Sequence, residues 1–587
     1  MNFKWNCVPP TPQQVQAAQE LSKAIGISPI LCRLLIERGI TDKEQAQKFF
    51  NPQLNELLDP WLMEDMDKAV QRICQAIDNG ERILVYGDYD VDGTTAVALV
   101  YNFLKRSYDN LDYYIPDRYN EGYGVSHQGV DYAYETGVKL VIVLDCGIKA
   151  IEEIAYAGEK GIDFIVCDHH VPDDQLPPAV AILNAKRFDS TYPFKHLSGC
   201  GVGFKLMQAF ALEKGMKFEE LLPSLDLVAV STASDIVPIM GENRVLTHYG
   251  LEQLNSNPCI GLKAIIHVCK LNDKNLSIND IIFKIGPRLN AAGRMSCGKK
   301  AVDLLVESDF DRAIELAENI DKENDERKRD DKEMTEEAGE IVNSLEAGEN
   351  LHAIVLYNEN WKRGVIGIVA SRLTEVFYKP AVVLTRTGNV ATGSARSVSG
   401  FDVYKAIESC KDLLENFGGH TYAAGLTMKV EKVEEFKRRF EEYVSEHIEP
   451  DQTQATLDID SDLDFKDITP KFFRDLKRFQ PFGPDNHKPV FRTCNVYDYG
   501  TSKVVGRGHE HIKLELIDSK SGHPLNGIAF GQSEYVTYIK TKRSFDICYS
   551  IEENNFKKGE ILLQIESIRP GFTESRKDSL QVPDVLS

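Results

Sequence analysis

The sequence predicts a multidomain α/β protein with a parallel-sheet domain, a long connecting helix, a smaller α/β domain and a C-terminal β-barrel. Three observations support this fold class. The chain has 587 residues, which is too long for one hydrophobic core. Short apolar stretches alternate with helical segments before and after a charge-dense stretch at 309–345, which is typical of parallel α/β domains. Beyond residue 451, short strands follow one another between turn residues, which favours a barrel.

Composition places the chain among globular proteins. Hydrophobic residues make up 42% and charged residues 27%, which excludes wholesale disorder and fibrous proteins. No apolar run reaches the roughly 18 residues of a membrane span, and the first residues lack a signal core, so we expect a cytoplasmic protein without membrane contact. The 12 cysteines form no CxxC pair, which favours reduced thiols over disulfides or structural zinc.

The formal net charge of −22 is unusual for a nucleic-acid-binding protein, because such proteins usually carry a basic footprint. Part of this negative charge falls in the acidic motifs described below. The value excludes a basic character of the whole surface, and any path for nucleic acid therefore has to be local.

The first domains are predicted in chain order. Residues 1–65 form an N-terminal helical segment of short amphipathic helices. Residues 66–308 form the parallel-sheet domain, in which five apolar stretches indicate buried strands. These stretches are Ile83–Tyr86, Tyr113–Ile115, Leu140–Leu144, Phe164–Cys167 and Ala179–Leu183.

The remaining chain is predicted to hold four further parts. Residues 309–345 are rich in helix formers, and one helix of that length would extend over about 55 Å. We interpret it as a connecting helix, and a solvated charged helix without a catalytic role is the alternative. The parts that follow are the second α/β domain at 346–450 with turns at Gly393 and Gly418-Gly419, the barrel at 451–570 and a flexible tail at 571–587.

Acidic and histidine side chains follow the predicted strands of the first domain. Ligands of parallel sheets bind at these carboxyl ends, where successive loops converge. Two carboxylates 4 Å apart repel each other by about 4 kcal/mol at an effective dielectric constant of 20, so their density predicts bound cations. The residues are Asp88, Asp90, Asp92, Asp145, Asp168, His169, His170 and Asp235, the last of which follows a predicted helix at 226–233.

The residue types indicate the metal and the chemistry. Asp90 and Asp92 lie on alternate residues of a predicted tight loop in which Gly93 lets the backbone approach a metal, although calcium loops and helix N-caps share this pattern. His169 and His170 are adjacent, so we expect one to reach metal and the other to face substrate, a buried hydrogen-bonded pair being the alternative. Imidazole beside carboxylates suits Mn²⁺ better than Mg²⁺. The ligand surplus predicts two ions about 3.5–4 Å apart and hydrolysis of a phosphate ester or anhydride.

These motifs resemble those of the DHH phosphoesterases, and the Asp168-His169-His170 motif gives that family its name. Further stretches are similar to the exonucleases of this family that are specific for single-stranded DNA. The resemblance covers about residues 60 to 570. The further stretches are Tyr192–Lys195, Gly201–Leu206, Pro287–Arg294 and Gly364–Ala370.

The resemblance implies a role for each candidate residue. The ligands of two Mn²⁺ or Mg²⁺ ions would be Asp90, Asp92, Asp145, His169 and Asp235. The residues that support these ligands would be Asp88 and Asp168. The residues acting at the scissile phosphate would be His170, Arg288, Asn290 and Arg294, a surface salt bridge being the alternative for Arg294. DNA would be bound by Arg396, Ser397, Gly419 and His420 of the second domain and by Arg507 of the barrel.

The last two domains carry the resemblance further, with one departure. The second α/β domain resembles the DHH-associated domain, and a helix cap is the alternative role for Gly418 and Gly419. The barrel resembles an OB-fold, which binds single strands by stacking bases on aromatic side chains and following phosphates with basic ones. Family members have a histidine after the tryptophan, whereas this chain has Lys362 after Trp361, so a substrate contact there stays open.

By this resemblance the protein is a 5′-to-3′ exonuclease that releases 5′-mononucleotides from single-stranded DNA in repair and recombination. A single-strand-binding protein and a helicase are the implied partners, and a monomer is the implied state. One alternative is a phosphodiesterase for oligoribonucleotides or cyclic dinucleotides, which the barrel and the chain length disfavour. The other is a DHH-fold scaffold without activity, which the intact acidic motifs disfavour.

Overall fold

The computed structural model describes residues 3–346, 351–554, 557 and 559–571. They form two compact units, one of residues 51–455 with 481–486, and one of the described parts of 2–50, 456–480 and 487–587. Each unit is thus made of separate chain segments, whereas the domains predicted from the sequence are continuous stretches. The predicted tail lies outside the described residues from position 572 onward.

A five-stranded parallel sheet forms the centre of the first unit and confirms the predicted fold class. All its neighbouring strands are parallel. β3 begins at Leu111 rather than Tyr113, and β6 begins at Ala181 rather than Ala179. In spatial order the strands are β3 (Leu111–Tyr114), β2 (Arg82–Gly87), β4 (Val138–Leu144), β5 (Asp163–Cys167) and β6 (Ala181–Leu183).

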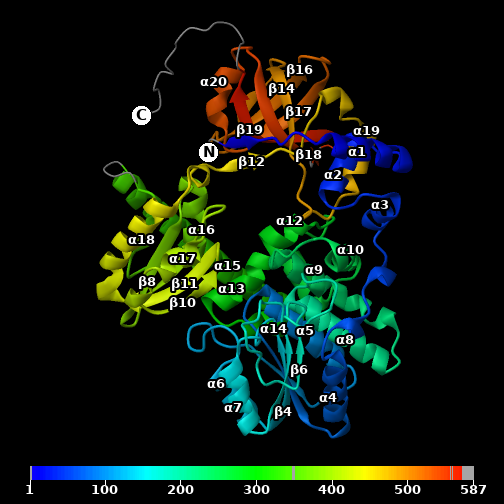
Figure 1. Cartoon of the computed structure of the whole chain (residues 1–587), viewed down its shortest axis with the longest axis vertical. Coiled ribbons are helices and arrows are strands. Elements are labelled where there is room, and N and C mark those ends of the chain that lie inside the picture. Colours follow the sequence, from blue (N-terminus) through cyan, green and yellow to red (C-terminus); the bar gives the residue numbers. More distant parts are fainter. Residues whose placement is uncertain (1–2, 347–350, 555–556, 558, 572–587) are drawn as a thin grey trace. The chain divides into compact units, whose positions relative to one another are not determined.

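Alternate residues of each strand pack into separate cores on the two faces of this sheet. Ile142 belongs to the core that also contains α5 (Val91–Lys105) and α8 (Gly199–Glu213). Val143 belongs to the core on the other face, where α7 (Ile151–Glu159) packs (Figure 1). Because both faces are buried, β2, β4 and β5 are mostly apolar, and this feature made them recognisable in the sequence.

Helix α15 (Phe310–Glu346) connects the sheet domain to the second domain of the same unit. It is continuous over 37 residues and lies within one residue of the predicted range 309–345 at each end. Ile320 is buried in the core of the sheet domain, and Val342 is buried in a core shared with the second domain. The helix therefore packs into both domains. This agrees with the interpretation as a connecting helix and not with the alternative of a solvated charged helix.

The second domain contains a mixed five-stranded sheet. β7 and β8 are parallel, and the other neighbouring pairs are antiparallel. In spatial order the strands are β10 (Leu414–His420), β11 (Ala423–Lys429), β9 (Val390–Arg396), β8 (Ala381–Thr387) and β7 (Ile354–Tyr357).

The glycines of this sheet correct one prediction. Gly393 lies within β9, and Gly418 and Gly419 lie within β10, so they form neither the predicted turns nor a helix cap. Close packing explains two of them, because a Cβ on Gly393 would lie 2.5 Å from Leu384 Cδ2, and one on Gly419 would lie 2.4 Å from the Ala423 carbonyl oxygen. Gly419 also has φ +149°, which disfavours a side chain.

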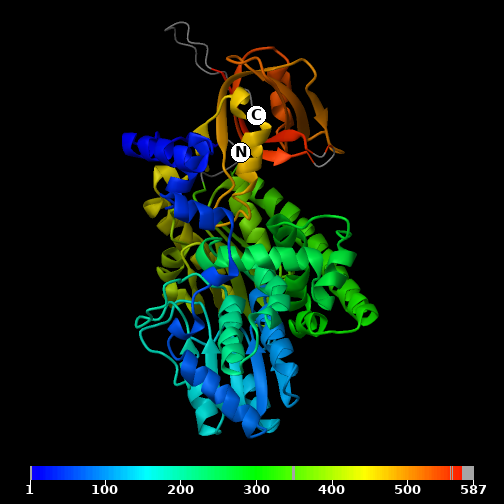
Figure 2. The same cartoon turned by 90° about the vertical axis from the view of Figure 1, so that its right-hand side faces the viewer.

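The second unit contains a closed β-barrel, as predicted for the C-terminal domain (Figure 2). Five strands follow one another around it, and the last of them pairs again with the first. In this order they are β14 (Phe491–Asp498), β18 (Phe545–Glu553), β19 (Ile561–Pro570), β17 (Pro524–Ala529) and β16 (His511–Asp518). The N-terminal helices of the same unit are α1 (Pro12–Ile25), α2 (Pro29–Glu37) and α3 (Lys43–Phe50).

Two expectations concerned disulfides and membrane spans. All 12 cysteines are free thiols, as their spacing predicted. Within the described parts of the chain, no helix combines the length and the apolar character that crossing a membrane requires.

Candidate metal centre

The acidic motifs meet at the carboxyl edge of the parallel sheet. Asp88 follows β2, Asp145 follows β4 and Asp168 follows β5, and these three strands are neighbours in the sheet. Asp235 directly follows α9 (Leu225–Ser234). The location of the site is therefore the one that the strand ends predicted.

The predicted tight loop at Asp90–Gly93 is instead the start of α5. Asp90 is the N-cap, and its Oδ1 accepts a hydrogen bond of 3.1 Å from Gly93 N. Asp92 already lies in the first helical turn. A Cβ on Gly93 would lie 2.5 Å from the Asp88 carbonyl oxygen, so this glycine lets the helix contact the end of β2 rather than a metal.

Asp92 is fixed by the start of α8. Its carboxylate accepts hydrogen bonds from Gly199 N at 2.7 Å, Cys200 N at 2.8 Å and Ser231 Oγ at 2.6 Å. These hydrogen bonds from a helix N-terminus fix the orientation of the carboxylate. A Cβ on Gly199 would lie 2.5 Å from Asp145 Cβ, and the same glycine therefore lets two candidate ligands approach each other.

His169 lies among three carboxylates. Its Nε2 is 3.2 Å from Asp145 Oδ1, 3.7 Å from Asp92 Oδ2 and 3.6 Å from Asp235 Oδ2. Among the described residues, neither ring nitrogen of His169 has a well-aligned hydrogen-bond partner, and the same holds for Asp145 Oδ1 and Asp88 Oδ1. Buried polar atoms without partners are costly, so these atoms fit a bound cation.

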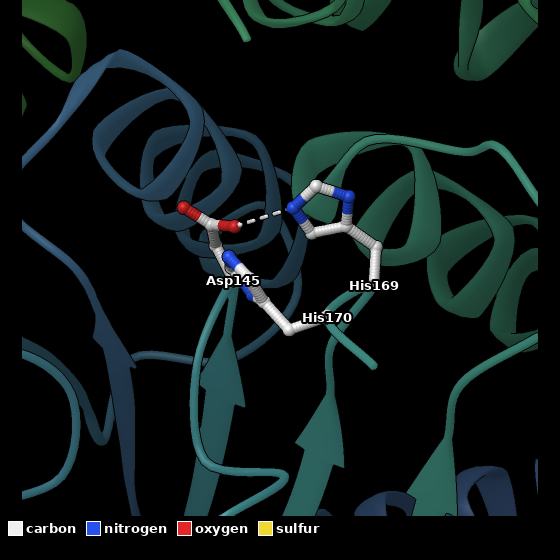
Figure 3. Close-up of side chains that lie close together, drawn as sticks. All are labelled: Asp145, His169 and His170. Carbon is white, nitrogen blue, oxygen red and sulfur yellow. Dashed lines mark ion pairs between the residues drawn. The ribbon is translucent and has the colours of Figure 1, made fainter. Parts of the chain in front are cut away.

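The two adjacent histidines both face Asp145 (Figure 3), so both can reach one metal ion, and the expected division into a metal ligand and a substrate contact stays a prediction. One ligand atom each of Asp145, His169 and His170 lie within 4.8 Å of one another. The reason is a tight backbone turn, in which Asp168 Oδ1 accepts from His169 N at 2.7 Å and from His170 N at 3.1 Å. This turn places the two ring centroids 4.5 Å apart.

Asp168 orients this pair and does not itself join the ligand groups. His170 Nδ1 lies 2.7 Å from Asp168 Oδ1, and Ile148 N donates to Asp168 Oδ2 at 3.0 Å. Burial alone would raise the pKa of Asp168, but the hydrogen bond and the nearby imidazoles lower it to about 2. The pKa of His170 is raised, because the same hydrogen bond outweighs burial. Burial lowers the pKa of His169 and favours its neutral, metal-binding form.

The carboxyl groups of Asp88, Asp145 and Asp235 show the opposite shift. Burial and then Asp92 raise the pKa of Asp145 well above its usual range, and burial and Asp90 do the same for Asp88. Burial, followed by Asp92 and Asp90, raises the pKa of Asp235 to about 8. Like charges that are buried together without a counter-charge produce such shifts, and divalent cations reverse them.

The donor set therefore fits divalent metal. Asp145, His169 and His170 form one group of possible ligands, and Asp92, His169 and Asp235 form another. Because His169 belongs to both groups, the two groups adjoin each other, and together they would offer ligands for two ions.

A cavity of about 450 Å³ is lined by both domains of the first unit. We call it the arginine pocket and define it by Tyr89, Arg118, Arg294 and Arg396. Tyr123 also lines it and connects it to the metal centre, because its hydroxyl donates to the Asp145 carbonyl oxygen at 3.1 Å and lies 3.4 Å from the ring nitrogens of His170.

The arginine pocket is strongly basic. Burial lowers the pKa of Arg294 to about 10, and the guanidiniums of Arg118, Arg327 and Arg396 contribute to this shift. Burial and Arg118 lower the pKa of Arg396 as well. In the described part of the chain, Arg118, Arg294 and Arg396 form no ion pair with a carboxylate. Adjacent guanidiniums without counter-ions indicate a phosphate site, and they form the local basic region that a chain of net charge −22 requires.

The other predicted residues lie outside the lining of this pocket, and their roles stay predictions. Arg288 Nε donates to Asp321 of α15 at 2.7 Å, which ties α13 (Gly286–Met295) to the connecting helix. Ser397 Oγ donates to the Phe401 carbonyl oxygen at 2.8 Å. The remaining residues are Asn290, which is half-buried, and Gly419, His420 and Arg507, which are exposed.

Sequence reasoning missed Arg118 and Tyr123. Both lie in the loop that follows β3, at the same carboxyl edge as the acidic motifs. Gly122 and Gly124 flank Tyr123 with φ +92° and +82°. This loop follows a strand of the parallel sheet as the acidic loops do, so its position could have indicated both residues. The pattern Gly-Tyr-Gly is typical of a sharply turned loop.

Three family models match the chain. The N-terminal domain of the DHH family matches residues 82–232, the DHHA1 domain matches 350–446, and the RecJ OB domain matches 459–567. The crystal structure of RecJ in complex with Mn²⁺ from Thermus thermophilus superposes with a TM-score of 0.82 and 25% identity, covering 97% of this chain and 80% of that one. A structure of exonuclease RecJ bound to manganese has a TM-score of 0.59 and 30% identity, covering 68% of this chain and 98% of that one.

Similarity to curated proteins extends over almost the whole sequence. The single-stranded-DNA-specific exonuclease RecJ of Bacillus subtilis (strain 168) is 36% identical and covers 96% of this chain and 70% of the relative. The protein of the same name from Escherichia coli (strain K12) is 33% identical and covers 92% of this chain and 95% of the relative. With the sheet domain, the second domain and the barrel all matched in order, the chain belongs to the RecJ family.

Proposed function

We propose that the protein is a single-stranded-DNA-specific exonuclease that releases 5′-mononucleotides in the 5′-to-3′ direction by metal-dependent hydrolysis. The observation that carries this proposal is that the buried carboxylate–histidine centre adjoins the arginine pocket, whose arginines form no ion pair among the described residues. Tyr123 lines the pocket and contacts both Asp145 and His170. The names and identities of its relatives support the substrate and the reaction.

The metal centre would hold two Mn²⁺ or Mg²⁺ ions. The ligands of the two groups are Asp145, His169 and His170, and Asp92, His169 and Asp235. Asp90 is close enough to interact with Asp92, His170 and Asp235. When bound, such ions supply Lewis acidity and lower the pKa of a water molecule.

The arginine pocket would position the terminal nucleotide. Arg294 and Arg396 offer guanidiniums to its phosphate, and the Arg118 guanidinium lies 5.0 Å from the centre of the Tyr89 ring. This cation–π pair holds an aromatic face ready for a base. A pocket of about 450 Å³ suits one nucleotide rather than a base pair, which favours single strands.

The finer parts of the proposal rest on the family. The barrel would bind the strand with basic side chains such as Arg507. The enzyme would act as a monomer in the cytoplasm, in DNA repair and recombination, together with a single-strand-binding protein and a helicase.

The direct test is degradation of a single-stranded 40-mer labelled at either end, with Mn²⁺, with Mg²⁺ and with chelator. We expect early release of the 5′ label as mononucleotide, only with metal and not from duplex DNA. Asp145→Asn should be inactive, whereas Asp174→Asn, at an exposed carboxylate after β5, should behave as the wild type. Rapid cleavage of a dinucleotide with an intact 40-mer would overturn the proposal in favour of a small-substrate phosphodiesterase.

A further inference from the structure

A second cavity of about 620 Å³ adjoins the arginine pocket, and the proposed function does not use it. We call it the side cavity. Six charged side chains line it besides Arg294. Three acidic ones and one basic one come from α15, and two basic ones come from the loop before α16 (Ile366–Phe377). They are Glu326, Asp330, Glu333, Arg329, Lys362 and Arg363.

The two cavities share part of their lining. Arg294, Arg363 and Gly364 line both of them. A Cβ on Gly364 would lie 2.3 Å from the Arg294 carbonyl oxygen and 2.8 Å from Tyr119 Oη, so the backbones of the two domains touch at this glycine. The Arg363 guanidinium lies 5.5 Å from the centre of the Tyr119 ring. The barrier between the cavities therefore includes the long side chains of Arg294 and Arg363, which can change rotamer without a change in fold.

The lining of the side cavity suits a ligand that carries a charged group together with uncharged polar groups. Within the described residues, none of the six charged side chains has an ion pair or a side-chain hydrogen bond, although opposite charges line the same cavity. Arg329, Lys362 and Arg363 suit a phosphate group. Glu326, Asp330 and Glu333 lie at helical spacings of four and three, so they share one face of α15 and would weaken the hold on an anion.

An exonuclease that keeps its strand between successive cleavages has to release each product while the strand stays bound. If the strand fills the arginine pocket as proposed, the hydrolysed nucleotide cannot leave along the path that the strand occupies. Product release limits the rate of many enzymes, so a separate way out has a direct kinetic value.

We propose that the side cavity is a binding site for the released nucleoside 5′-monophosphate, which reaches it past Arg294 and Arg363 and leaves from it while the DNA stays bound. This inference rests on the proposed exonuclease function. The cations of the side cavity attract the phosphate, and its carboxylates keep the affinity low enough for departure.

The binding test uses full-length protein made inactive by Asp145→Asn, with Mn²⁺, a saturating 5′-phosphorylated oligonucleotide and radiolabelled dAMP as the probe. We expect one dAMP to bind to the DNA complex in equilibrium dialysis. Arg329→Glu should raise its Kd about tenfold, since a charged hydrogen bond is replaced by repulsion. Lys332→Glu is the matched control, because it makes the same change on the same helix outside the cavity lining and should leave the Kd unchanged.

Two results would overturn the proposal. The first is that the oligonucleotide displaces all dAMP. The second is that the Arg329→Glu and Lys332→Glu variants bind dAMP equally well. Lys362→Glu repeats the test from another element of the fold, so a folding defect of one variant cannot decide the outcome.

A kinetic test separates this inference from the proposed function. Added dAMP should slow degradation of the 40-mer by the wild-type enzyme, and saturating DNA should not relieve the inhibition. If DNA relieves it completely, the side cavity is not a product site, although the exonuclease function stands. If the 40-mer is not degraded with metal at all, the function itself fails.

Discussion

Two buried charged clusters of the first unit differ in how their charges are balanced. In one of them, Lys205 Nζ lies 3.1 Å from Glu242 Oε1, and Tyr192 Oη donates to Glu242 Oε2 at 2.6 Å. Leu58 N donates to Glu242 Oε1 at 2.9 Å. Opposite charges meet here, and the polar atoms find partners within the protein.

In the metal centre, by contrast, the carboxylates are not balanced by an equal number of positive side chains among the described residues. Its carboxylates carry the same charge, and the pKa values of Asp145 and Asp88 are raised. Among the described residues, Asp145 Oδ1, Asp88 Oδ1 and both nitrogens of His169 lack well-aligned hydrogen-bond partners. Burial of charge is common to both clusters, so burial does not identify a functional site. A missing counter-charge does identify a functional site, because the balancing cation has to come from outside the chain.

The comparison predicts opposite effects of removing one charge. Asp145→Asn should lower the rate of DNA cleavage by at least about 10³-fold, since electrostatic groups of active sites have effects of this order. The same change should not lower the thermal stability of the metal-free protein, because it removes repulsion from Asp92 and Asp235. Cleavage of the labelled 40-mer and thermal unfolding in chelator measure the two quantities. Near-normal cleavage would remove Asp145 from the site.

In the cluster of Lys205, Glu242 and Tyr192, which we call the balanced cluster, the expected effect is on the free energy of unfolding. Lys205→Met should lower the free energy of unfolding by about 3–5 kcal/mol, because it leaves the Glu242 carboxylate buried without its partner. The double variant Lys205→Met with Glu242→Gln should recover part of this loss. Urea unfolding of the metal-loaded protein measures it, and activity per folded molecule should be unchanged. A fall in activity without a loss of stability would show that this cluster, too, is functional.

The geometry of the metal centre can be tested without changing a charge. Gly199→Ala should lower activity by up to about 10²-fold, because a Cβ at this position would lie 2.5 Å from Asp145 Cβ and displace a ligand. Gly158→Ala on α7 is the matched control, since nothing lies within 4 Å of its added Cβ. Steady-state rates with increasing Mn²⁺ measure the effect. Equal rates for the two variants would contradict the close approach of α8.

The sequence was sufficient to predict the fold class and the acidic part of the site. Asp145 and Asp168 follow apolar strands, and a parallel sheet gathers such strand ends at one edge whatever its helices do. The contact between Asp92 and Gly199 could not be predicted in this way, because 107 residues separate them and helix packing brings them together.

Glycine caused the clearest error. Gly393 reads as a turn residue in the sequence, yet it lies in β9, where Leu384 leaves no room for a Cβ. Composition cannot separate a glycine that turns the chain from one that lets neighbours approach, because the neighbours decide. The balanced cluster shows the same limit, since Tyr192 and Lys205 carry the family resemblance although their contacts are structural.

The smallest predicted effect is a pH dependence of stability that the metal centre should show and the Lys205–Glu242 cluster should not. The pKa of Asp235 is raised from 3.8 to about 8 in the metal-free fold, so its carboxyl group binds a proton more tightly when folded. Its contribution to stability is complete below about pH 4 and is lost as the pH rises through about 8. Because this side chain is 26% exposed, solvent reduces the size of the effect.

Thermal unfolding in chelator at a series of pH values tests this dependence, with Asp235→Asn as the comparison. The wild type should lose stability relative to the variant between pH 4 and 8, and Mn²⁺ should restore more of it at pH 8 than at pH 5, because cations bind the ionised carboxylates. Parallel curves for the two proteins would mean that Asp235 titrates normally. The missing counter-charge would then lie with Asp88, Asp90 and Asp145 alone, and the second group of metal ligands would lose its support.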